Sequence, residues 1–283
     1  MAKPGERGDP GREGPDWDVW RGAGFLPGAA AGGVGLFFCE TGKIAERERR
    51  LFLSWLDAGE EERRRRFLDE RDAVLFAVAH GLTRYVLSLW RIGEGRPGWE
   101  VAPGDWRFAV DAAGRPAALL PAGMEKTAGT PIFSLSHTRG AVALAVAAAG
   151  KLGVDVERSR RPTEAALLAE RFFAPEELAD LAGCRGEKDS RKRFILYWTL
   201  KEAYLKALGV GMIKSLSSFA MSPGRDGADL LYDMDGAEGE WLFRHYHPPG
   251  GFTLSLAVGG SAFPDEPRIV RLAHRPGRGW SCW

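Results

Sequence analysis

In each half of the chain, short segments with the two-residue periodicity of β-strands flank a longer stretch with helical periodicity. The helical stretch runs from Ile44 to Trp90 in the first half and from Thr163 to Leu208 in the second. Gly, Pro and Asp separate the strand-like segments, which is typical of short antiparallel connections. This order predicts an α+β fold with a small sheet and a group of helices in each half.

We expect two lobes between two less regular ends. The first residues are rich in Gly, Pro and charge and cannot bury enough apolar surface to offset chain entropy. The predicted regions are a disordered tail (1–16), an N-terminal lobe (17–127), a C-terminal lobe (128–265) and a C-terminal extension (266–283). Three adjacent antiparallel strands are expected to open the second lobe: Ile132–Ser136, Ala141–Ala148 and Leu152–Glu157.

The overall charge gives no reason to expect a nucleic acid or a membrane as partner. Lys and Arg total 39 and Asp and Glu total 38, so the net charge is +1. No stretch approaches the roughly 18 consecutive apolar residues of a membrane span, and the first residues lack the apolar core of a signal peptide. The three cysteines are far apart in sequence and form no CxxC pair. We therefore expect a cytoplasmic protein.

Apolar and acidic residues alternate in the third of these strands. In an extended strand Leu152, Val154 and Val156 face the core, while Asp155 and Glu157 share the other face, about 7 Å apart. Two carboxylates so placed form half of a site for a hard cation such as Mg²⁺. Taken alone, the pattern also fits the solvent face of an amphipathic strand.

A second candidate lies on the helical segment that ends near Gly209. Trp198, Glu202 and Lys206 are four residues apart and therefore form one stripe. A carboxylate and an ammonium group one turn apart can hold a metal ion and a phosphate together. The alternative is an exposed Glu-Lys pair, which contributes only about 0.3–0.5 kcal/mol.

A third candidate follows an apolar segment at Phe133. Ser134, Ser136, His137 and Arg139 place two hydroxyls, an imidazole and a guanidinium near one turn, and all of these groups can donate to phosphate. A serine hydrolase is disfavoured because adjacent residues of a strand point to opposite faces and the chain has no GxSxG motif.

Four sequence blocks now combine into one family pattern. They are Ser-His at 136–137, Gly-Val-Asp-Val-Glu at 153–157, Arg-Phe-Phe-Ala-Pro-Glu-Glu at 171–177 and Trp-Thr-Leu-Lys-Glu-Ala-Tyr-Leu-Lys at 198–206. Their order and separations closely resemble those of the Sfp-type 4′-phosphopantetheinyl transferases. Weaker likeness extends from Arg63 to Val258, so only the N-terminal tail and about the last twenty residues fall outside it.

The resemblance implies a fold of two pseudo-symmetric lobes with coenzyme A and Mg²⁺ in the cleft between them. It implies that Asp155, Glu157 and Glu202 hold the metal and that Lys206 grips a phosphate oxygen. Glu202 or a metal-bound water would take the proton of the attacking serine, so Glu202 and Lys206 are the expected catalytic residues. Glu177 matches the acidic residue of the third block, for which we assign no role.

For the nucleotide of coenzyme A, the resemblance implies contacts from Ser136 and His137 to the end that carries the 3′-phosphate. Arg115 takes the basic position of a Gly-Lys-Pro turn beside the adenine. The sequence departs from the family at Leu75, where a basic residue often contacts the 3′-phosphate. Three arginines are candidates to replace that residue: Arg63, Arg71 and Arg84.

The implied activity is that of a holo-[carrier protein] synthase. It transfers 4′-phosphopantetheine from coenzyme A to a serine of an apo acyl or peptidyl carrier protein and releases 3′,5′-ADP. Family members of this length resemble monomers. Two alternatives stay open: a magnesium-dependent nuclease, because Asp-x-Glu with a helical Glu and Lys also suits a phosphodiester, and a non-catalytic coenzyme A-binding relative.

Arg63 also belongs to a run of charge that needs a separate explanation. Asp57 and Glu60 have the spacing of a helix capping box, and the arginines at 63–66 directly follow three glutamates. Opposite charges alternating along a helix are typical of a solvated face. We therefore do not interpret the arginines as a nucleic-acid site.

Overall fold

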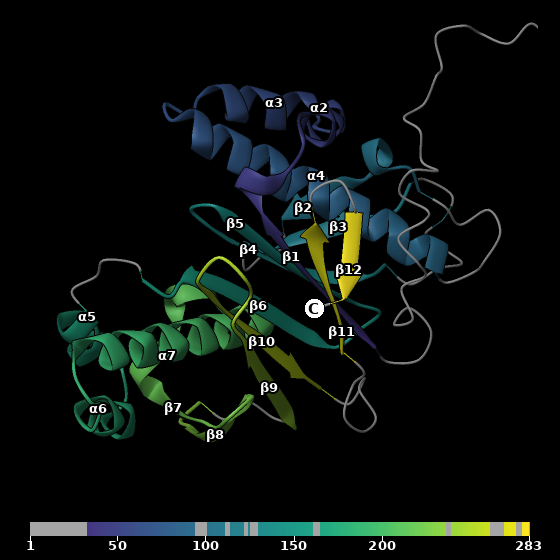
Figure 1. Cartoon of the computed structure of the whole chain (residues 1–283). Coiled ribbons are helices and arrows are strands. Elements are labelled where there is room, and N and C mark those ends of the chain that lie inside the picture. The colour runs from purple at the N-terminus through teal and green to yellow at the C-terminus, as the bar shows by residue number, and fades with distance from the viewer. Residues whose placement is uncertain are drawn as a thin grey trace, which may run out of the picture.

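The computed structural model describes residues 33–93, 101–110, 114–121, 124, 130–160, 165–235, 239–260, 269–275 and 279–282. Its helices and strands lie in two lobes, one above the other in Figure 1. The predicted disordered tail at residues 1–16 lies outside the described ranges. The α+β class predicted from the sequence is confirmed, because each lobe combines a mainly antiparallel sheet with helices.

The first sheet combines strands from both ends of the described chain. In spatial order its strands are β12 (Gly279–Cys282), β11 (Ile269–Arg275), β1 (Val34–Glu40), β5 (Ala141–Ala147) and β4 (Ile132–Thr138). Neighbouring strands are antiparallel except β1 and β11, which are parallel. β1 and β5 are therefore central strands, and their residues are almost all buried.

The second sheet is antiparallel throughout. Its spatial order is β6 (Lys151–Arg158), β10 (Phe252–Gly259), β9 (Trp241–Tyr246), β8 (Gly227–Asp233) and β7 (Phe219–Pro223). Its helices are α5 (Ala165–Phe172), α6 (Pro175–Ala182) and the long α7 (Glu187–Leu208). α7 packs on β6 and β10.

The two sheets face each other, and one long helix covers the outer side of each. Leu36 and Phe38 pack against β6 and β10, whereas Phe37 points to the other side and packs against α4 (Glu70–Gly93). Alternate residues of a strand point to opposite faces, so β1 contributes to both cores. Figure 1 shows the resulting order of layers, from α4 through the two sheets to α7.

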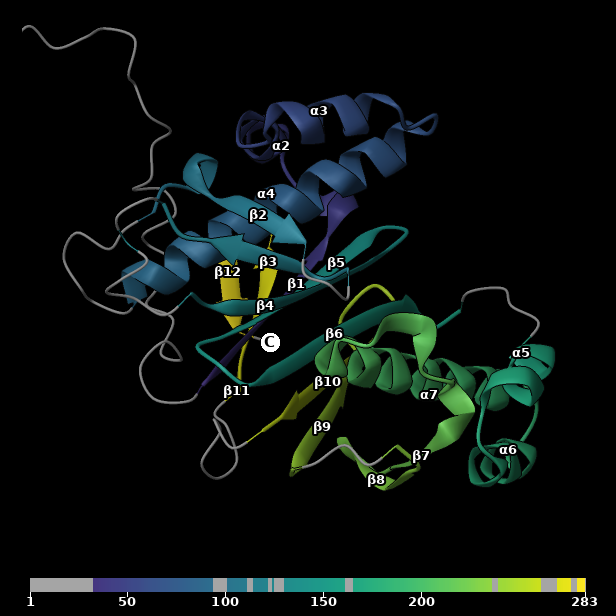
Figure 2. The ribbon, with the colours of Figure 1, turned by 180° about the vertical axis from the view of Figure 1, so that it is seen from behind.

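The remaining elements lie around α4 and near the end of α7. They are α2 (Glu46–Ser54), α3 (Ala58–Arg65), the hairpin β2 (Arg107–Val110) and β3 (Pro116–Leu119), and the 3₁₀ turns at Thr41–Lys43, Pro103–Asp105, Gly211–Ile213 and Leu216–Ser218. Figure 2 shows the hairpin beside α4. The expected capping box is present, since Asp57 and Glu60 each accept the other's backbone N–H at 2.9 Å.

The sheets divide the chain differently from the predicted lobes. The boundary expected at residue 128 would assign β4 and β5 to the second lobe, but both belong to the first sheet, as do β11 and β12 from the expected C-terminal extension. β5 pairs with β1 on one side and β4 on the other, so only β6 of the three expected adjacent strands enters the second sheet. Pairing partners distant in sequence, rather than the local pattern, decide this division.

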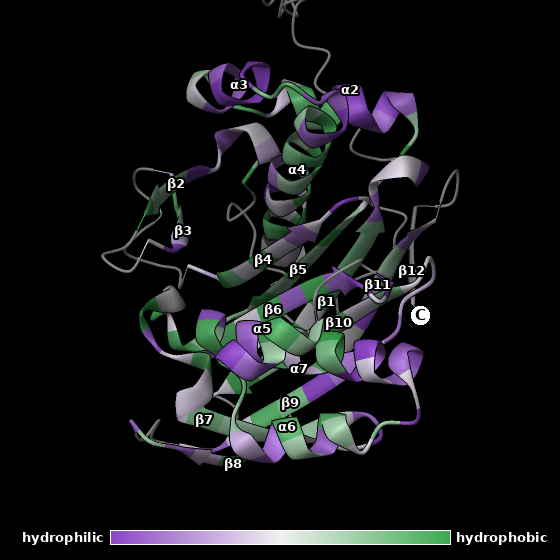
Figure 3. Cartoon of the chain, turned by 90° about the vertical axis from the view of Figure 1, so that its left-hand side faces the viewer, coloured by the Kyte–Doolittle hydropathy of each residue, from purple (hydrophilic) through white to green (hydrophobic). Residues whose placement is uncertain are grey.

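One helix has the length and composition of a membrane span. Within the part of the chain that the structure describes, this helix covers Glu70–Trp90 in α4, and 83% of its most apolar window is buried inside the protein. In Figure 3, α4 and the strands carry many hydrophobic residues, whereas α2 and α3 are largely hydrophilic. This burial is typical of the core helix of a globular lobe.

Candidate active site between β6 and α7

A glycine brings the two elements of the site together. A Cβ atom on Gly153 of β6 would lie 1.9 Å from the carbonyl oxygen of Ala203 and 2.6 Å from the nitrogen of Ala207, both in α7. The helix backbone therefore rests directly on the strand. This contact lies within the helix segment that carries Glu202 and Lys206, and beside the strand residues Asp155 and Glu157.

Asp155 lies at the centre of the site and is 6% exposed. Its Oδ1 accepts hydrogen bonds from Lys206 Nζ and from Ser136 Oγ, each at 2.7 Å. Its Oδ2 is buried and has no hydrogen-bond partner among the residues that the structure describes. A buried acceptor without a partner is costly unless something else supplies the interaction, so this oxygen is a candidate ligand for a cation.

Glu202 lies close enough to Asp155 and Glu157 for their charges to change its pKa. Burial raises the pKa of Glu202, the carboxylates of Asp155 and Glu157 raise it further, and the Lys206 ammonium opposes them. The three acidic side chains named from the sequence thus share one region with the lysine. Their mutual repulsion is the condition that a divalent cation relieves.

Glu157 is held by the neighbouring strand of the first sheet. Thr138 Oγ1 donates to its Oε2 at 2.8 Å. The Lys206 Nζ also donates to the Val154 carbonyl at 3.2 Å, so the ammonium is fixed against β6 at two points. The arrangement therefore has defined orientations for both strand carboxylates and for the lysine.

The donor set fits a Mg²⁺ that is shared with a ligand better than a closed protein cage. In the described parts of the chain, no group of three or more His, Cys, Asp or Glu side chains is already arranged to hold a metal. Mg²⁺ usually takes one or two protein carboxylates and completes its shell with waters and substrate phosphates. The buried Asp155 Oδ2 and the clustered acidic charge meet that requirement.

A cavity of about 640 Å³ adjoins the site. β3, β4, the start of β6 and the end of α7 line it, and Arg115, Lys151 and Lys206 contribute its cations. Arg115 packs against the helix end, because a Cβ atom on Gly209 would lie 2.2 Å from its Cζ. Gly209 has φ of 73°, which glycine adopts without strain. The volume is that of a site for a small organic ligand.

His137 and Ser136 follow one another on β4 but have different surroundings. Burial lowers the pKa of His137, and the charges of Lys206 and His80 lower it further. His137 is therefore a neutral neighbour of the lysine near pH 7. Ser136 is buried, and its hydroxyl donates a hydrogen bond to the Asp155 carboxylate.

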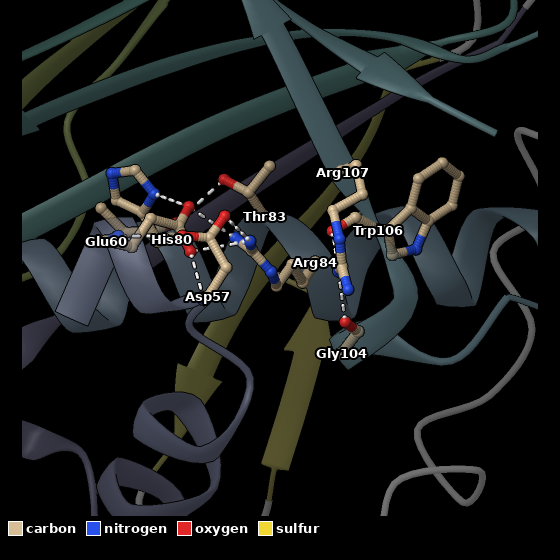
Figure 4. A network of polar contacts seen from close by, with 9 residues as sticks. Asp57, Glu60, His80, Thr83, Arg84, Gly104, Trp106 and Arg107 are labelled. Carbon is tan, nitrogen blue, oxygen red and sulfur yellow. Dashed lines mark hydrogen bonds and ion pairs between the residues drawn. The ribbon is translucent and has the colours of Figure 1, made fainter. Parts of the chain in front are cut away.

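The arginines named as candidates to replace a basic residue at position 75 differ in their exposure to solvent. Leu75 is buried in the core cluster that α4 forms with β1 and β5. Arg84 is also buried, and its Nη2 lies 2.7 Å from Glu60 Oε2, which rules it out as a ligand contact (Figure 4). Arg63 is exposed, with its Cζ 5.6 Å from the centre of the Phe76 ring.

Sequence reasoning missed the network around Arg84. Glu60 Oε1 lies 2.7 Å from His80 Nδ1 and 3.0 Å from Arg84 Nη1, and Figure 4 shows these side chains converging from α3 and α4. Burial would raise the pKa of Glu60, but hydrogen bonds from His80 and the Asp57 N–H, with the Arg84 charge, lower it to about 2. The capping-box spacing was the available signal for the position of Glu60.

Comparison with known proteins gives a match over part of the chain. Residues 151–257 match the model of the 4′-phosphopantetheinyl transferase superfamily. The chain is similar to the 4′-phosphopantetheinyl transferase HetI of a Nostoc species, with 32% identity over 56% of this chain and 62% of HetI. It is also similar to the 4′-phosphopantetheinyl transferase Sfp of Bacillus subtilis, with 23% identity over 80% of this chain and 92% of Sfp.

Among solved structures, the chain resembles the holo-[acyl-carrier-protein] synthase of Thermotoga maritima with a TM-score of 0.31 and 21% identity, over 46% of this chain and 80% of that one. It resembles the holo-(acyl-carrier-protein) synthase of Bacillus anthracis with a TM-score of 0.33 and 22% identity, over 38% and 94%. The family match covers the strand and helix that carry the acidic site. The chain is therefore similar to the 4′-phosphopantetheinyl transferases, most clearly over residues 151–257, and it spans 62% of the length of HetI.

Proposed function

We propose that this protein transfers the 4′-phosphopantetheine group of coenzyme A to a serine of an apo carrier protein and releases 3′,5′-ADP. It is then a holo-[carrier protein] synthase, in agreement with the superfamily model that residues 151–257 match and with the similarity to HetI and Sfp. The observation that carries the proposal is the meeting of Asp155, Glu202 and Lys206 between β6 and α7. Phosphoryl transfer depends mainly on such positioning and charge neutralisation.

The three carboxylates are proposed to hold the cation that coenzyme A brings with its pyrophosphate. Asp155 would offer Oδ2, the oxygen that the described protein leaves unpartnered, and Glu157 and Glu202 would complete the protein ligands. Mg²⁺ bound there would neutralise the charge that develops on the pyrophosphate oxygens. Lys206, held beside Asp155, would donate to a phosphate oxygen.

Glu202 is proposed to accept the proton of the carrier serine. Its carboxylate lies in the same region as Asp155 and Lys206, so it offers an acceptor oxygen where the phosphate is transferred. The serine oxygen forms a bond to the β-phosphorus of coenzyme A, the bond from that phosphorus to the bridging oxygen breaks, and 3′,5′-ADP leaves with the electron pair. The serine proton moves to Glu202, so atoms and charge balance.

The cavity is proposed to receive the nucleotide of coenzyme A. Arg115 lines it, and we propose that His137, whose pKa the Lys206 charge lowers, and Arg63, which is exposed on α3, also contact phosphate oxygens. We also propose that the protein acts as a cytoplasmic monomer, which gel filtration with light scattering would test for the oligomeric state.

The decisive experiment is to weigh an apo carrier protein after incubation with the enzyme, coenzyme A and Mg²⁺. A gain of about 340 Da, the mass of the phosphopantetheinyl group, is expected at the serine oxygen. The matched control is Glu202→Gln, which keeps the shape of the side chain and should give no gain in the same time. An unchanged carrier mass with wild-type enzyme across several carriers would contradict the proposal. Cleavage of DNA or RNA in that case would favour the nuclease alternative.

A further inference from the structure

Side-chain hydroxyls connect the two sheets beside the active site. β4 and β6 are edge strands of different sheets and lie next to each other. Ser134 Oγ accepts the Val154 N–H at 3.0 Å, and Ser136 Oγ accepts the Val156 N–H at 3.3 Å. Hydroxyls of one strand thus satisfy backbone donors of the other. We call this contact, formed by Ser134, Ser136 and Thr138, the hydroxyl seam.

Two members of the hydroxyl seam also hold acidic side chains. Ser136 Oγ donates to Asp155 Oδ1 at 2.7 Å, and Thr138 Oγ1 donates to Glu157 Oε2 at 2.8 Å. The three seam residues are two apart on β4, and the two carboxylates are two apart on β6, so the shared strand periodicity matches each hydroxyl to its carboxylate. Ser134, the first member, accepts the Val154 N–H of β6, and among the described residues its hydroxyl is not bonded to a carboxylate.

We propose that Thr138 and Ser136 are positioning residues that orient Glu157 and Asp155 toward the catalytic cation. The inference rests on the proposed function, since it assigns a task within that same site. A hydrogen bond to one oxygen fixes the rotation of a carboxylate and therefore the direction of its other oxygen. For Asp155, Ser136 and Lys206 both engage Oδ1, and the buried Oδ2 stays available.

The hydroxyl seam also makes the site dependent on the contact between the lobes. Asp155 and Glu157 belong to the second sheet, but the hydroxyls that orient them belong to the first. A shift of β4 relative to β6 would therefore release both carboxylates together. Ser134 shares the seam without touching a carboxylate, so it separates the effect of the lobe contact from the effect of orientation.

The test compares Mn²⁺ affinity, measured by electron paramagnetic resonance in the presence of saturating coenzyme A, with the thermal midpoint of each full-length variant. Thr138→Val keeps the shape of the side chain and removes the donor, and we expect Mn²⁺ binding about ten-fold weaker. Thr138→Ser restores a hydroxyl and should restore the affinity. Ser134→Ala should lower the thermal midpoint and weaken Mn²⁺ binding much less than Thr138→Val does.

Each outcome shows whether the hydroxyls orient the carboxylates or only stabilise the fold. The inference is overturned if Thr138→Val binds Mn²⁺ like wild type, or if Ser134→Ala weakens binding as much as Thr138→Val. Ser136→Ala provides a second reading, with the same expected loss of Mn²⁺ affinity. Failure of the wild-type protein to bind Mn²⁺ with coenzyme A would instead overturn the proposed function, so the two failures are distinguishable.

Discussion

Glu177 and Lys201 form an ion pair, with 2.8 Å between Oε1 and Nζ, although neither side chain is exposed to solvent. Backbone groups complete their hydrogen bonds: the carbonyls of Leu216 and Phe219 accept from Lys201, and the N–H groups of Ala174 and Met221 donate to Glu177. The pair therefore connects α6, α7 and β7. It gives Glu177, the acidic residue of the third sequence block, a structural role.

Removing one member of this pair should destabilise the protein strongly. Lys201→Met leaves the Glu177 carboxylate buried without its counter-ion, so we expect a loss of about 3–5 kcal/mol in the free energy of unfolding, measured with urea. Arg50→Met is the matched control, because Arg50 pairs with Glu46 on the exposed surface of α2 and should matter little. Equal urea midpoints for Lys201→Met and wild type would contradict the structural role.

Acid should weaken the Glu60 network in a defined pH range. The pKa of Glu60 is lowered to about 2 in the folded state from an ordinary value of 4.5, so its stabilisation is complete above pH 4.5 and disappears as the pH falls toward 2. Glu60→Gln should therefore lose roughly 3–5 kcal/mol of unfolding free energy at pH 7, because buried Arg84 loses its nearer counter-ion and keeps only Asp57 at 3.8 Å among the described residues. The difference from wild type should shrink between pH 4.5 and 2.

The comparison for this prediction is Glu62→Gln. Glu62 lies on the same helix, but its ion pair with Arg66 is exposed. Urea midpoints of Glu62→Gln should follow those of wild type at every pH. A difference between Glu60→Gln and wild type that stayed constant from pH 7 to 2 would show that ionisation of Glu60 is not the cause.

Gly153→Ala should separate α7 from β6. The added methyl would lie 1.9 Å from a helix carbonyl oxygen, so the backbone must shift, and we expect a loss of about 3 kcal/mol or more in unfolding free energy. Carrier modification should fall as well, because Glu202 and Lys206 move away from Asp155. Gly224→Ala should be tolerated, since its Cβ would meet only the Gly227 carbonyl oxygen at 3.7 Å. Normal stability of Gly153→Ala would refute the close contact.

Lys206→Gln should separate catalysis from metal binding. Loss of the ammonium removes a donor to the transferring phosphate, and we expect carrier modification at least about 100-fold slower, followed by mass spectrometry. Mn²⁺ affinity should fall much less, because Asp155 keeps its contact with Ser136. Lys192→Gln on the exposed part of α7 is the control and should react like wild type. Unchanged transfer by Lys206→Gln would exclude its proposed role.

Local periodicity was sufficient to predict the two surfaces that meet in the site. The alternation on β6 correctly separated Val154 and Val156, which are buried between the sheets, from Asp155 and Glu157. The helical spacing of Glu202 and Lys206 and the glycine at 209 predicted the end of α7, where φ of 73° confirms the left-handed cap. The resemblance to a family then joined two elements that no local rule connects.

The sheet order and the Arg84 network could not be predicted in the same way. β5 is buried on both faces because α4 packs on one face and the second sheet on the other, and its run of apolar residues does not say that β1 and β4 are its pairing partners. An arginine is usually exposed, and the carboxylate that permits burial of Arg84 lies 24 residues earlier in the chain. Both features depend on contacts between distant segments.

The order of strands in the first sheet has a consequence for how the protein is made. The second sheet and α7 come from one continuous stretch, residues 151–259, and can assemble as soon as that stretch has left the ribosome. β1 is synthesised long before β11, its parallel neighbour, so one edge of β1 stays open until the last strands emerge. Nascent chains should therefore complete the lobe that carries the carboxylates first. Until β11 has been synthesised, the open edge of β1 in the first sheet can pair with other chains and aggregate.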